Sequence, residues 1–374
     1  MTYEFGHCGV DELPELVALT NCVFRSGRAG DMGAEYPLVF NERNVENLLV
    51  ARAEGRIVAH VGICLRDATI LGVPVRVASI GSVATDPAHR GHGSASRLMA
   101  LAREQAVRSG ASLMLISGLR GLYHRLGYVQ VGDFRNYSIP AAPGVTDLDV
   151  EVIAANDLAA VVRLHQSEPV RFLRSLDDWQ RLLSAGMLMN HTADLLLIRE
   201  QGVAVAYVGI QRPELPHAPS KPVLIKEFAG CRATLARALP GIATRYTAPA
   251  VELIASAADA GWNGAATGHG WPGDPLPFPG TLGIIDVPRF LAAAAPLLEE
   301  RVGSSLRLTA VGDVVRLEAA GESVPLQNAS QFTALMFGGD TEEARVLPWL
   351  SPAVQRVVDA ALPLPLLWYG YNYV

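Results

Sequence analysis

The sequence predicts a mixed α/β (α+β) fold in which two tandem copies of one domain precede a smaller α/β domain. Three observations predict it: an internal repeat, a glycine-rich junction between a strand and a helix in the first copy, and a change of pattern after residue 280. Half of the 374 residues are hydrophobic and 18% are charged, which is typical of folded chains with large cores. At this length we expect two or three domains.

The internal repeat lies in residues 48–63 and 195–210, where nine of sixteen aligned positions are identical at an offset of 147. Each copy predicts a strand, a tight turn at Gly55 or Gly202, and a second strand. Glycine permits the positive φ of such a turn, and the flanking β-branched residues suit paired strands. Two hairpins could converge on this pattern, but nine matches in one register favour duplication.

The glycine-rich junction of the first copy follows a predicted strand over residues 75–85 and precedes a predicted amphipathic helix over 95–106. Glycines let backbone N–H groups point at an anion, and a helix N-terminus adds partial positive charge. This order of elements suits a pyrophosphate, although a plain glycine-rich turn is the alternative. The residues of the junction are Arg90, Gly91, His92, Gly93, Ser94 and Ala95.

The second copy continues with a predicted strand over residues 222–230, a helix over 231–239 and a strand over 250–257. Its junction between strand and helix has no glycine-rich run, so its backbone cannot approach a pyrophosphate closely. We therefore expect one anion site, in the first copy, and a second copy that supplies walls and contacts.

Two proline- and glycine-rich stretches, residues 139–144 and 264–280, are predicted to be breaks. They divide the chain into predicted domains at 1–140, 145–280 and 281–374. Within the third domain, Asp286 is the predicted N-cap of its first helix. The predicted elements there are helices over 287–302 and 352–362 and strands over 305–310 and 314–319.

Charge, hydropathy and cysteine usage exclude several classes of protein. The formal net charge of −6 argues against a nucleic-acid partner. No apolar run is long enough to span a bilayer and the N-terminus lacks an export signal, so we expect a cytoplasmic protein with no membrane partner. The four cysteines are scattered and no two histidines have metal-ligand spacing, so we predict neither a disulfide framework nor a metal site.

The junction resembles the acetyl-coenzyme A signature of the GNAT acyltransferases, Arg/Gln-x-x-Gly-x-Gly/Ala, with Arg90, Gly93 and Ala95 in the defining places. The resemblance implies acetyl-CoA as the co-substrate, bound by the whole run of residues 90–95. It also implies that the preceding strand contacts the pantetheine arm through its main chain, with one N–H as the oxyanion donor. The strand residues concerned are Val83, the donor, with Ala84 and Thr85.

Two GNAT-like copies followed by a small α/β domain resemble the enhanced-intracellular-survival (Eis) type acetyltransferases over essentially the whole chain. Residues 119–127 resemble that family's Gly-x-Tyr-x-Arg-Phe/Leu-Gly segment. The resemblance implies a sterol-carrier-like third domain and acetylation of a primary amine, as in aminoglycosides, polyamines or lysine side chains. Relatives often form homo-oligomers. The net acidity of the chain favours a cationic acceptor.

The resemblance assigns the general acid to Tyr123, because the first tyrosine of the family's segment protonates the leaving sulfur. An ordinary tyrosine has a pKa near ~10 and keeps its proton at neutral pH. The alternative is a packing tyrosine, the role that we expect for Tyr128. The resemblance assigns the base to the C-terminal carboxylate on Val374, which would act through a pKa raised by burial or through a water relay.

The tail, residues 366–374, is apolar and aromatic up to its end, which predicts that it is buried. It departs from the better-known family members, which end in phenylalanine, because valine keeps the carboxylate but not the ring. A strand that packs the third domain is the alternative. His60 and the acidic residues Asp31 and Glu35 are further candidates for the cleft, with plain solvation the alternative for the two carboxylates.

Two other functions stay open at this point. One is a regulatory module that holds coenzyme A without turnover. The other is lipid carriage by residues 285–374, which would need a deep apolar tunnel in a domain with little room for one. Tyr123 and the apolar tail favour the enzyme.

Overall fold

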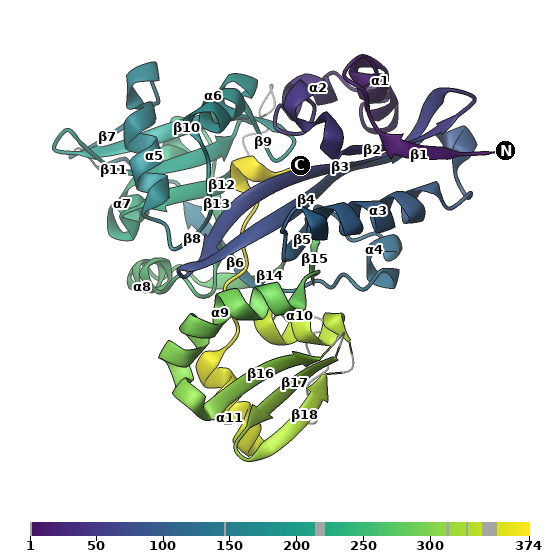
Figure 1. The fold of residues 1–374 in the computed structure, drawn as a ribbon. Helices are drawn as coiled ribbons and strands as arrows, with labels where there is room; N and C mark the ends of the chain where they lie inside the picture. Colours follow the sequence, from purple (N-terminus) through teal and green to yellow (C-terminus); the bar gives the residue numbers. More distant parts are fainter. Residues whose placement is uncertain (1, 146, 214–220, 312–313, 327, 339–349) are drawn as a thin grey trace.

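The computed structural model describes residues 2–374 except 146, 214–220, 312–313, 327 and 339–349. Figure 1 shows two mixed α/β lobes side by side and a smaller lobe beneath them. The final residues, in yellow, run from the small lobe up between the other two. No helix in the described part of the chain is long and apolar enough to cross a membrane.

The first lobe is built on a sheet with the strand order β1-β2-β3-β4-β5-β15, to which β8 is added by pairing with β3. Neighbouring strands of this sheet are antiparallel, except β4 and β5, which run parallel. The strands are β1 (Glu4–His7), β2 (Leu48–Ala53), β3 (Arg56–Ile70), β4 (Val73–Thr85), β5 (Leu113–Ile116), β8 (Val170–Phe172) and β15 (Thr281–Ile284). The helices are α1 (Leu13–Phe24), α2 (Met32–Glu35), α3 (Ser94–Arg108) and α4 (Gly121–Arg125), with 3-10 turns at Glu42–Asn47 and Pro87–His89.

Helices α1 and α3 cover opposite faces of this sheet. Leu48 and Val50 of β2 share a buried cluster with α1, whereas Leu49 and Ala51 share one with α3. Side chains alternate between the two faces of a strand, so a strand buried on both faces is apolar throughout. This is why β2 is a nearly unbroken apolar run.

The second lobe has a sheet with the order β14-β6-β13-β12-β11-β10-β7, and β9 pairs with β10. Only β12 and β13 are parallel neighbours. The strands are β6 (Asp133–Pro140), β7 (Leu148–Val152), β9 (Met187–Leu188), β10 (His191–Glu200), β11 (Val203–Gln211), β12 (Val223–Gly230), β13 (Ala250–Ser256) and β14 (Gly273–Pro277). The helices are α5 (Leu158–Gln166), α6 (Leu176–Ala185), α7 (Arg232–Arg245) and α8 (Ala260–Gly268), with a 3-10 turn at Ala155–Asp157.

The internal repeat forms equivalent hairpins, β2–β3 and β10–β11. Gly55 and Gly202, in their turns, both have φ of +76°. Each hairpin continues into an antiparallel strand, a helix and a parallel strand: β4-α3-β5 in the first lobe and β12-α7-β13 in the second. The predicted mixed α/β fold class is confirmed.

The third lobe packs helices against a three-stranded antiparallel sheet, β16-β17-β18. Three phenylalanine side chains, Phe290, Phe332 and Phe337, are fully buried in its core. Its elements are α9 (Val287–Val302), β16 (Leu306–Val311), β17 (Val314–Ala319), β18 (Glu322–Leu326), α10 (Ala329–Phe337) and α11 (Pro352–Ala361), with a 3-10 turn at Gly303–Ser305. Asp286 caps α9 by accepting a hydrogen bond from the Arg289 N–H.

The predicted domain limits 1–140, 145–280 and 281–374 do not coincide with the sheets. β6 precedes the first limit but lies in the second sheet, and β15 follows the second limit but pairs with β5 in the first sheet. The predicted break at 264–280 is also wrong, because α8 and β14 occupy much of it. The prolines of β14 are tolerated there because it is an edge strand that pairs only with β6.

Side chains of the tail fix it between the lobes by donating to main-chain carbonyls of both sheets. The Trp368 Nε1–H donates to the Lys226 carbonyl at 2.7 Å, and the Tyr369 hydroxyl donates to the Ile116 carbonyl at 2.8 Å. The tail ends in a 3-10 turn, Gly370–Asn372, so the alternative of a strand in the third domain is wrong. The prediction that the tail is buried is correct up to Val374, which is 8% exposed.

Candidate functional site

The site begins where β4 parts from β5. Their parallel pairing ends at Ile80 and Ile116. In the antiparallel register of β4 with β3, Gly81 faces Gly62 and the next pair is Ala84 with His60. Ser82 and Val83 thus form a bulge, with Ser82 at φ +50°. The bulge leaves backbone groups of β4 outside the ladder and re-aims the strand.

A groove of about 500 Å³ follows the bulge and the glycine-rich junction. It is lined by one end of β4, the junction, the start of α3 and residues around α4. The lining residues proposed from the sequence are Val83, Thr85, Arg90, Gly91, His92, Gly93, Ser94 and Ala95. Arg120 and Arg125 add two guanidinium groups that sequence reasoning missed.

The junction has the geometry of an anion cradle. Gly91 and Gly93 have φ of +83° and +78°, and a Cβ on either would meet no atom within 4 Å. The positive φ therefore requires glycine, and the space in front of both is open. The first N–H groups of α3 have no partner within the helix, and the buried Ser94 hydroxyl oxygen has no hydrogen-bond partner in the part of the chain that the structure describes. These donors suit a phosphate-type ligand.

A larger cleft of about 1170 Å³ lies on the other side of the bulge and shares Val83 and Arg120 with the groove. The first lobe, the second lobe and the tail all line it. The first lobe supplies Val83, Ser117, Arg120 and Tyr123, the second lobe Met187, Asn190, His191 and Arg212, and the tail Tyr373 and Val374. A ligand held in the groove can thus extend past Val83 into the cleft.

Tyr123 lies on the short helix α4 and is 4% exposed, yet it lines the cleft. Burial raises the pKa of its phenol, an effect that the nearby Arg120 guanidinium partly offsets. The phenol therefore keeps its proton at neutral pH. Tyr128 points into the core, where its hydroxyl donates to the Met114 sulfur at 2.8 Å.

Val374 reaches the bulge from the opposite side. The Ser117 hydroxyl donates to a carboxyl oxygen of Val374 at 2.5 Å. A Cβ on Gly81 would lie 2.5 Å from the Val374 carbonyl carbon, so only glycine admits this approach. The structure therefore brings Tyr123, Val374 and Val83 to one cleft.

His60 is fully buried behind the bulge and does not face the cleft itself. Its Nδ1 lies 3.0 Å from the Leu49 carbonyl and its Nε2 3.0 Å from the Ser82 hydroxyl. Burial lowers its pKa to about 4, so the ring is neutral at pH 7. A neutral ring that donates from Nδ1 accepts from Ser82 through Nε2, which holds the bulge in place.

The acidic candidates have structural partners. Asp31 caps α2 by accepting from the Gly33 and Ala34 N–H groups and from the Asn21 amide. Glu35 lines the cleft and forms an ion pair with Arg25, whose Nε donates at 2.9 Å. Neither carboxylate is free to act alone as an attractor for an ammonium group.

Ala84 lines neither cavity, because it pairs with His60 and its side chain is buried. The second copy was expected to supply walls and contacts, as it does, but sequence reasoning missed which of its residues line the cleft, and it also missed Ser117 and Gly81. Gly81 and Ser117 come directly after Ile80 and Ile116, the last paired residues of β4 and β5. Residues at the ends of the predicted strands could therefore have been named as candidates from the sequence. Nothing local marks Met187 to Thr192, because their role depends on how the lobes dock.

Comparison with known families identifies one part of the chain. Residues 8–131 match the family model of an acetyltransferase (GNAT) domain. A sequence search of curated proteins finds no significant match.

Solved structures resemble the chain over nearly its whole length at low sequence identity. A GCN5-related N-acetyltransferase from Anabaena variabilis superposes with a TM-score of 0.68 at 15% identity and covers 98% of both chains. A probable N-acyltransferase from Enterococcus faecalis gives 0.71 at 15% identity, with 98% of this chain and 99% of that chain covered. Eis1 from Mycobacterium abscessus gives 0.62 at 13% identity, with 97% and 99% covered. These likenesses show the fold.

Residues 8–131 are thus a GNAT acetyltransferase domain, and the chain is an acyltransferase that uses acetyl-CoA or a related acyl-CoA as co-substrate. The predicted enzyme class and co-substrate are confirmed. The sterol-carrier-like character of the third lobe stays a prediction.

The neutral, buried state of His60 predicts a dependence of stability on pH. The folded pKa of about 4 lies below the ordinary histidine pKa of about 6.5, so between these pH values the unfolded chain binds more protons and stability falls as the pH falls. The unfolding free energy of the wild type should fall between pH 7 and pH 4.5. We expect this fall to be about 2 kcal/mol smaller in His60→Asn, which has no imidazole to protonate on unfolding. Urea denaturation of both proteins at the two pH values measures this. Parallel losses would show that His60 does not take up a proton on unfolding.

Proposed function

We propose that the chain is an N-acetyltransferase that moves the acetyl group of acetyl-CoA to a primary amine, with Tyr123 as general acid and the Val374 carboxylate as base or base relay. One observation carries the proposal. The groove with the glycine-rich junction and the cleft with Tyr123 and Val374 meet at Val83. A diphosphate held at residues 90–95 would direct its thioester arm along β4 to that meeting point.

The residues of the groove fit the co-substrate. The N–H groups at the start of α3, the Ser94 hydroxyl and the open space at Gly91 and Gly93 would hold the pyrophosphate, with Arg90 as a further cation. The main chain of Val83 and Thr85 would align the pantetheine arm. Ala84 would act only through its backbone, since its side chain is buried.

The chemistry requires four events that this cleft can support. The amine attacks the thioester carbonyl, and the Val83 N–H would stabilise the oxyanion that forms. The C–S bond then breaks and the Tyr123 phenol would give its proton to the leaving thiolate. The Val374 carboxylate would take the proton that the new C–N bond releases from the amine, directly or through a water. The phenol stays protonated for this because burial raises its pKa.

The charges of the cleft argue for an acceptor with a single amine. Its lining carries four arginines, of which Arg25 is paired with Glu35 and Arg212 with Asp194. Arg28 and Arg120 add positive charge, whereas the negative groups of the described lining are the Glu35 side chain and the terminal carboxylate of Val374. A polyamine or an aminoglycoside would bring several cations to this surface, so a monoamine is the better fit. The net negative charge of the chain favours a cationic acceptor, but the charge of the cleft differs from that of the whole chain, because arginines predominate in its lining.

Tyr123→Phe tests the assigned acid. We expect the acetylation rate to fall by about 10²-fold or more, with coenzyme A affinity unchanged, because only the proton donor is removed. Release of free thiol from acetyl-CoA, measured with monoamines, polyamines and aminoglycosides as acceptors, gives the rate and shows which acceptor class reacts best. Tyr128→Phe is the control and should keep the wild-type rate. Unchanged turnover in Tyr123→Phe would remove it as the acid.

A chain extended by three glycines after Val374 tests the base. The carboxylate would then be displaced from Ser117, and the closeness of Val374 to Gly81 leaves no room for further residues. We expect turnover to be lost while coenzyme A still binds. The control carries the same three glycines after Gly321, in the exposed turn before β18. An extended enzyme of full activity would reject the role of Val374.

Gly93→Val tests the pyrophosphate site. Gly93 and Gly55 both have positive φ and open surroundings, so valine costs a similar strain at either position. Only Gly93 lies in the groove, where the valine side chain would occupy the phosphate space. We expect no coenzyme A binding by calorimetry in Gly93→Val and normal affinity in Gly55→Val. Equal affinities in the two variants would place the pyrophosphate elsewhere.

A further inference from the structure

The second lobe has its own cavity at the point where its parallel strands part. Pairing between β12 and β13 ends at Ile225 and Leu253. A register shift between Gly209 and Ile210 leaves Lys226 as a bulge on β12. Beyond this point the strands separate around a cavity of about 380 Å³. This is the place in the second copy that corresponds to the catalytic cleft of the first.

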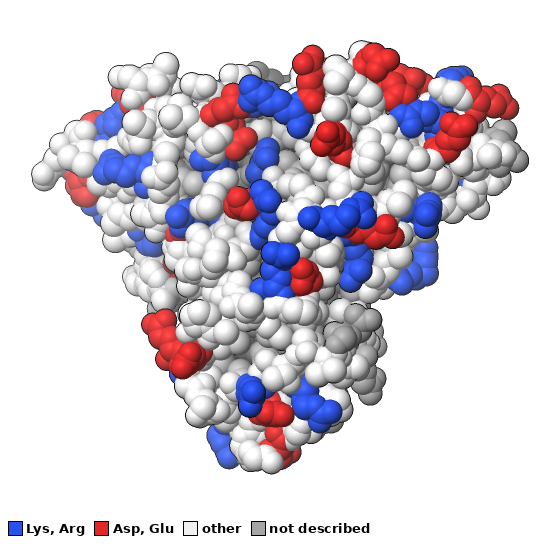
Figure 2. Space-filling view, viewed as in Figure 1, with Lys and Arg blue, Asp and Glu red and all other residues white. Residues whose placement is uncertain are grey.

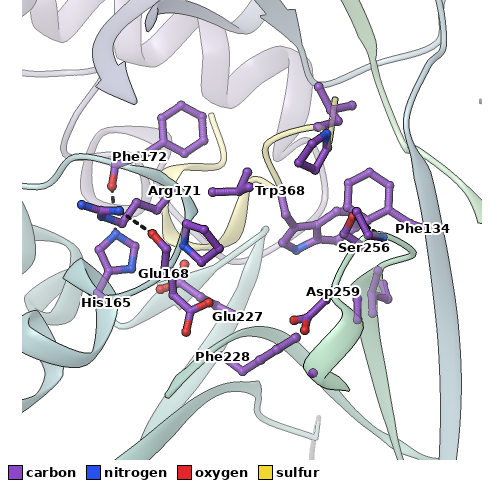
Figure 3. A pocket seen from close by; sticks show the side chains of 18 of the residues that line it. Phe134, His165, Glu168, Arg171, Phe172, Glu227, Phe228, Ser256, Asp259 and Trp368 are labelled. Carbon is purple, nitrogen blue, oxygen red and sulfur yellow. Dashed lines mark hydrogen bonds between the residues drawn. The ribbon is translucent and has the colours of Figure 1, made fainter. Parts of the chain in front are cut away.

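The cavity walls combine aromatic rings with charged groups (Figure 3). Phe134 and Trp368 lie with ring centroids 5.0 Å apart, and Phe228 stands on the strand beside Lys226. The tail crosses one side, where the Trp368 Nε1–H satisfies the carbonyl of the bulge. A volume of this size, with aromatic side chains beside polar groups that can orient a ligand, is typical of small-molecule sites.

The charged groups of the cavity leave positive charge uncompensated. Its lining has four cations and three carboxylates. Glu227 pairs with Arg174, and Glu168 and Asp259 both pair with Arg232. Arg171 and Lys226 form no ion pair with any described residue. Figure 2 shows that Lys and Arg side chains gather along the middle of the molecule, although the chain as a whole is acidic.

Two side chains of this lining have a nitrogen atom with no hydrogen-bond partner among the described residues. The Arg171 Nε is buried and has no hydrogen bond, although the Nη1 of the same side chain donates to the Glu168 carbonyl. The Lys226 amine has no hydrogen bond or salt bridge in the described part of the structure. Burial lowers the pKa of Lys226, and the charge of Glu252 offsets part of this. Both side chains would gain from an anion in the cavity.

Coenzyme A is not the occupant that this cavity fits. The N-terminus of α7, which corresponds to the pyrophosphate end of α3, already holds a carboxylate of the protein. The Gly230 N–H donates to Glu168 Oε1 at 2.8 Å, and Arg232 bonds both oxygens of the same carboxylate. A diphosphate would be repelled there. A ligand of the cavity must therefore lie between the strands and carry its charge toward Lys226.

We propose that the cavity between β12 and β13 is a second ligand site, which binds a small carboxylate with an aromatic or apolar body. The carboxylate pairs with Lys226, and the body packs against Phe134 and Trp368. Its occupant touches the tail shortly before Val374, so the site adjoins the segment that enters the catalytic cleft. The site is separate from the transfer reaction and its occupancy requires neither acyl-CoA nor an amine.

Titration calorimetry of the full chain with phenylacetate, 3-phenylpropionate and 4-phenylbutyrate, each beside its neutral amide, tests the site. We expect at least one carboxylate to bind with a Kd below about 1 mM. The Kd of its neutral amide should be about tenfold higher or more. Saturating coenzyme A should leave the binding unchanged, because the two sites are distinct. No carboxylate binding below that limit would overturn the proposal.

Lys226→Met is the decisive variant, because it removes the charge, keeps most of the apolar stem and breaks no hydrogen bond or salt bridge with a described residue. It should bind carboxylate and amide equally. Lys221→Met is the matched control, since Lys221 is the other lysine of the chain, is exposed and lies outside the cavity. A carboxylate preference that survives Lys226→Met would overturn the proposal. So would acetic anhydride labelling, read by mass spectrometry, in which bound carboxylate fails to protect Lys226 relative to Lys221.

Discussion

The catalytic arrangement depends on the parting of β4 from β5. Backbone groups in a continuous sheet are paired with each other and are not available to a ligand. Pairing of β4 with β5 ends at Ile80, and the bulge at Ser82 and Val83 interrupts the pairing of β4 with β3. His60 holds this bulge from behind. Because burial keeps this ring neutral well below pH 7, the support of the bulge does not change over the physiological range. The same opening gives Val374 access to the centre of the sheet.

The second lobe acts on this centre by fixing the tail. Arg174 donates from both Nη atoms to the Glu227 carboxylate at 2.7 Å and from Nε to the Asn372 side chain, while Glu227 accepts from the Tyr371 N–H. Burial alone would raise the pKa of Glu227, but the Arg174 charge outweighs it and lowers the pKa to about 2. Breaking such a buried pair costs about 3–5 kcal/mol. The position of Val374 in the first lobe therefore depends on the fold of the second.

Local features of the site could be predicted from the sequence, and features set by docking could not. The turn glycines, the junction at Gly91 and Gly93, and helix α3 follow from backbone freedom and periodicity within a few residues. The exchange of β6 and β15 between sheets, and the lining at Met187 and Asn190, follow from contacts far apart in sequence. The tail showed by its composition that it is buried, but not in which lobe it ends.

The two copies differ in how their helix N-termini are satisfied, and this difference is consistent with the separate roles that we propose for them. The start of α3 is open and glycine-rich, so its unpaired N–H donors are available to an external anion. At the start of α7, Glu168 and Arg232 supply the equivalent charges from within the protein. The absent glycines and the internal carboxylate are thus two aspects of one change, which closes the pyrophosphate position but not the gap between the strands. That gap persists because the bulge at Lys226 still ends the pairing of β12 with β13.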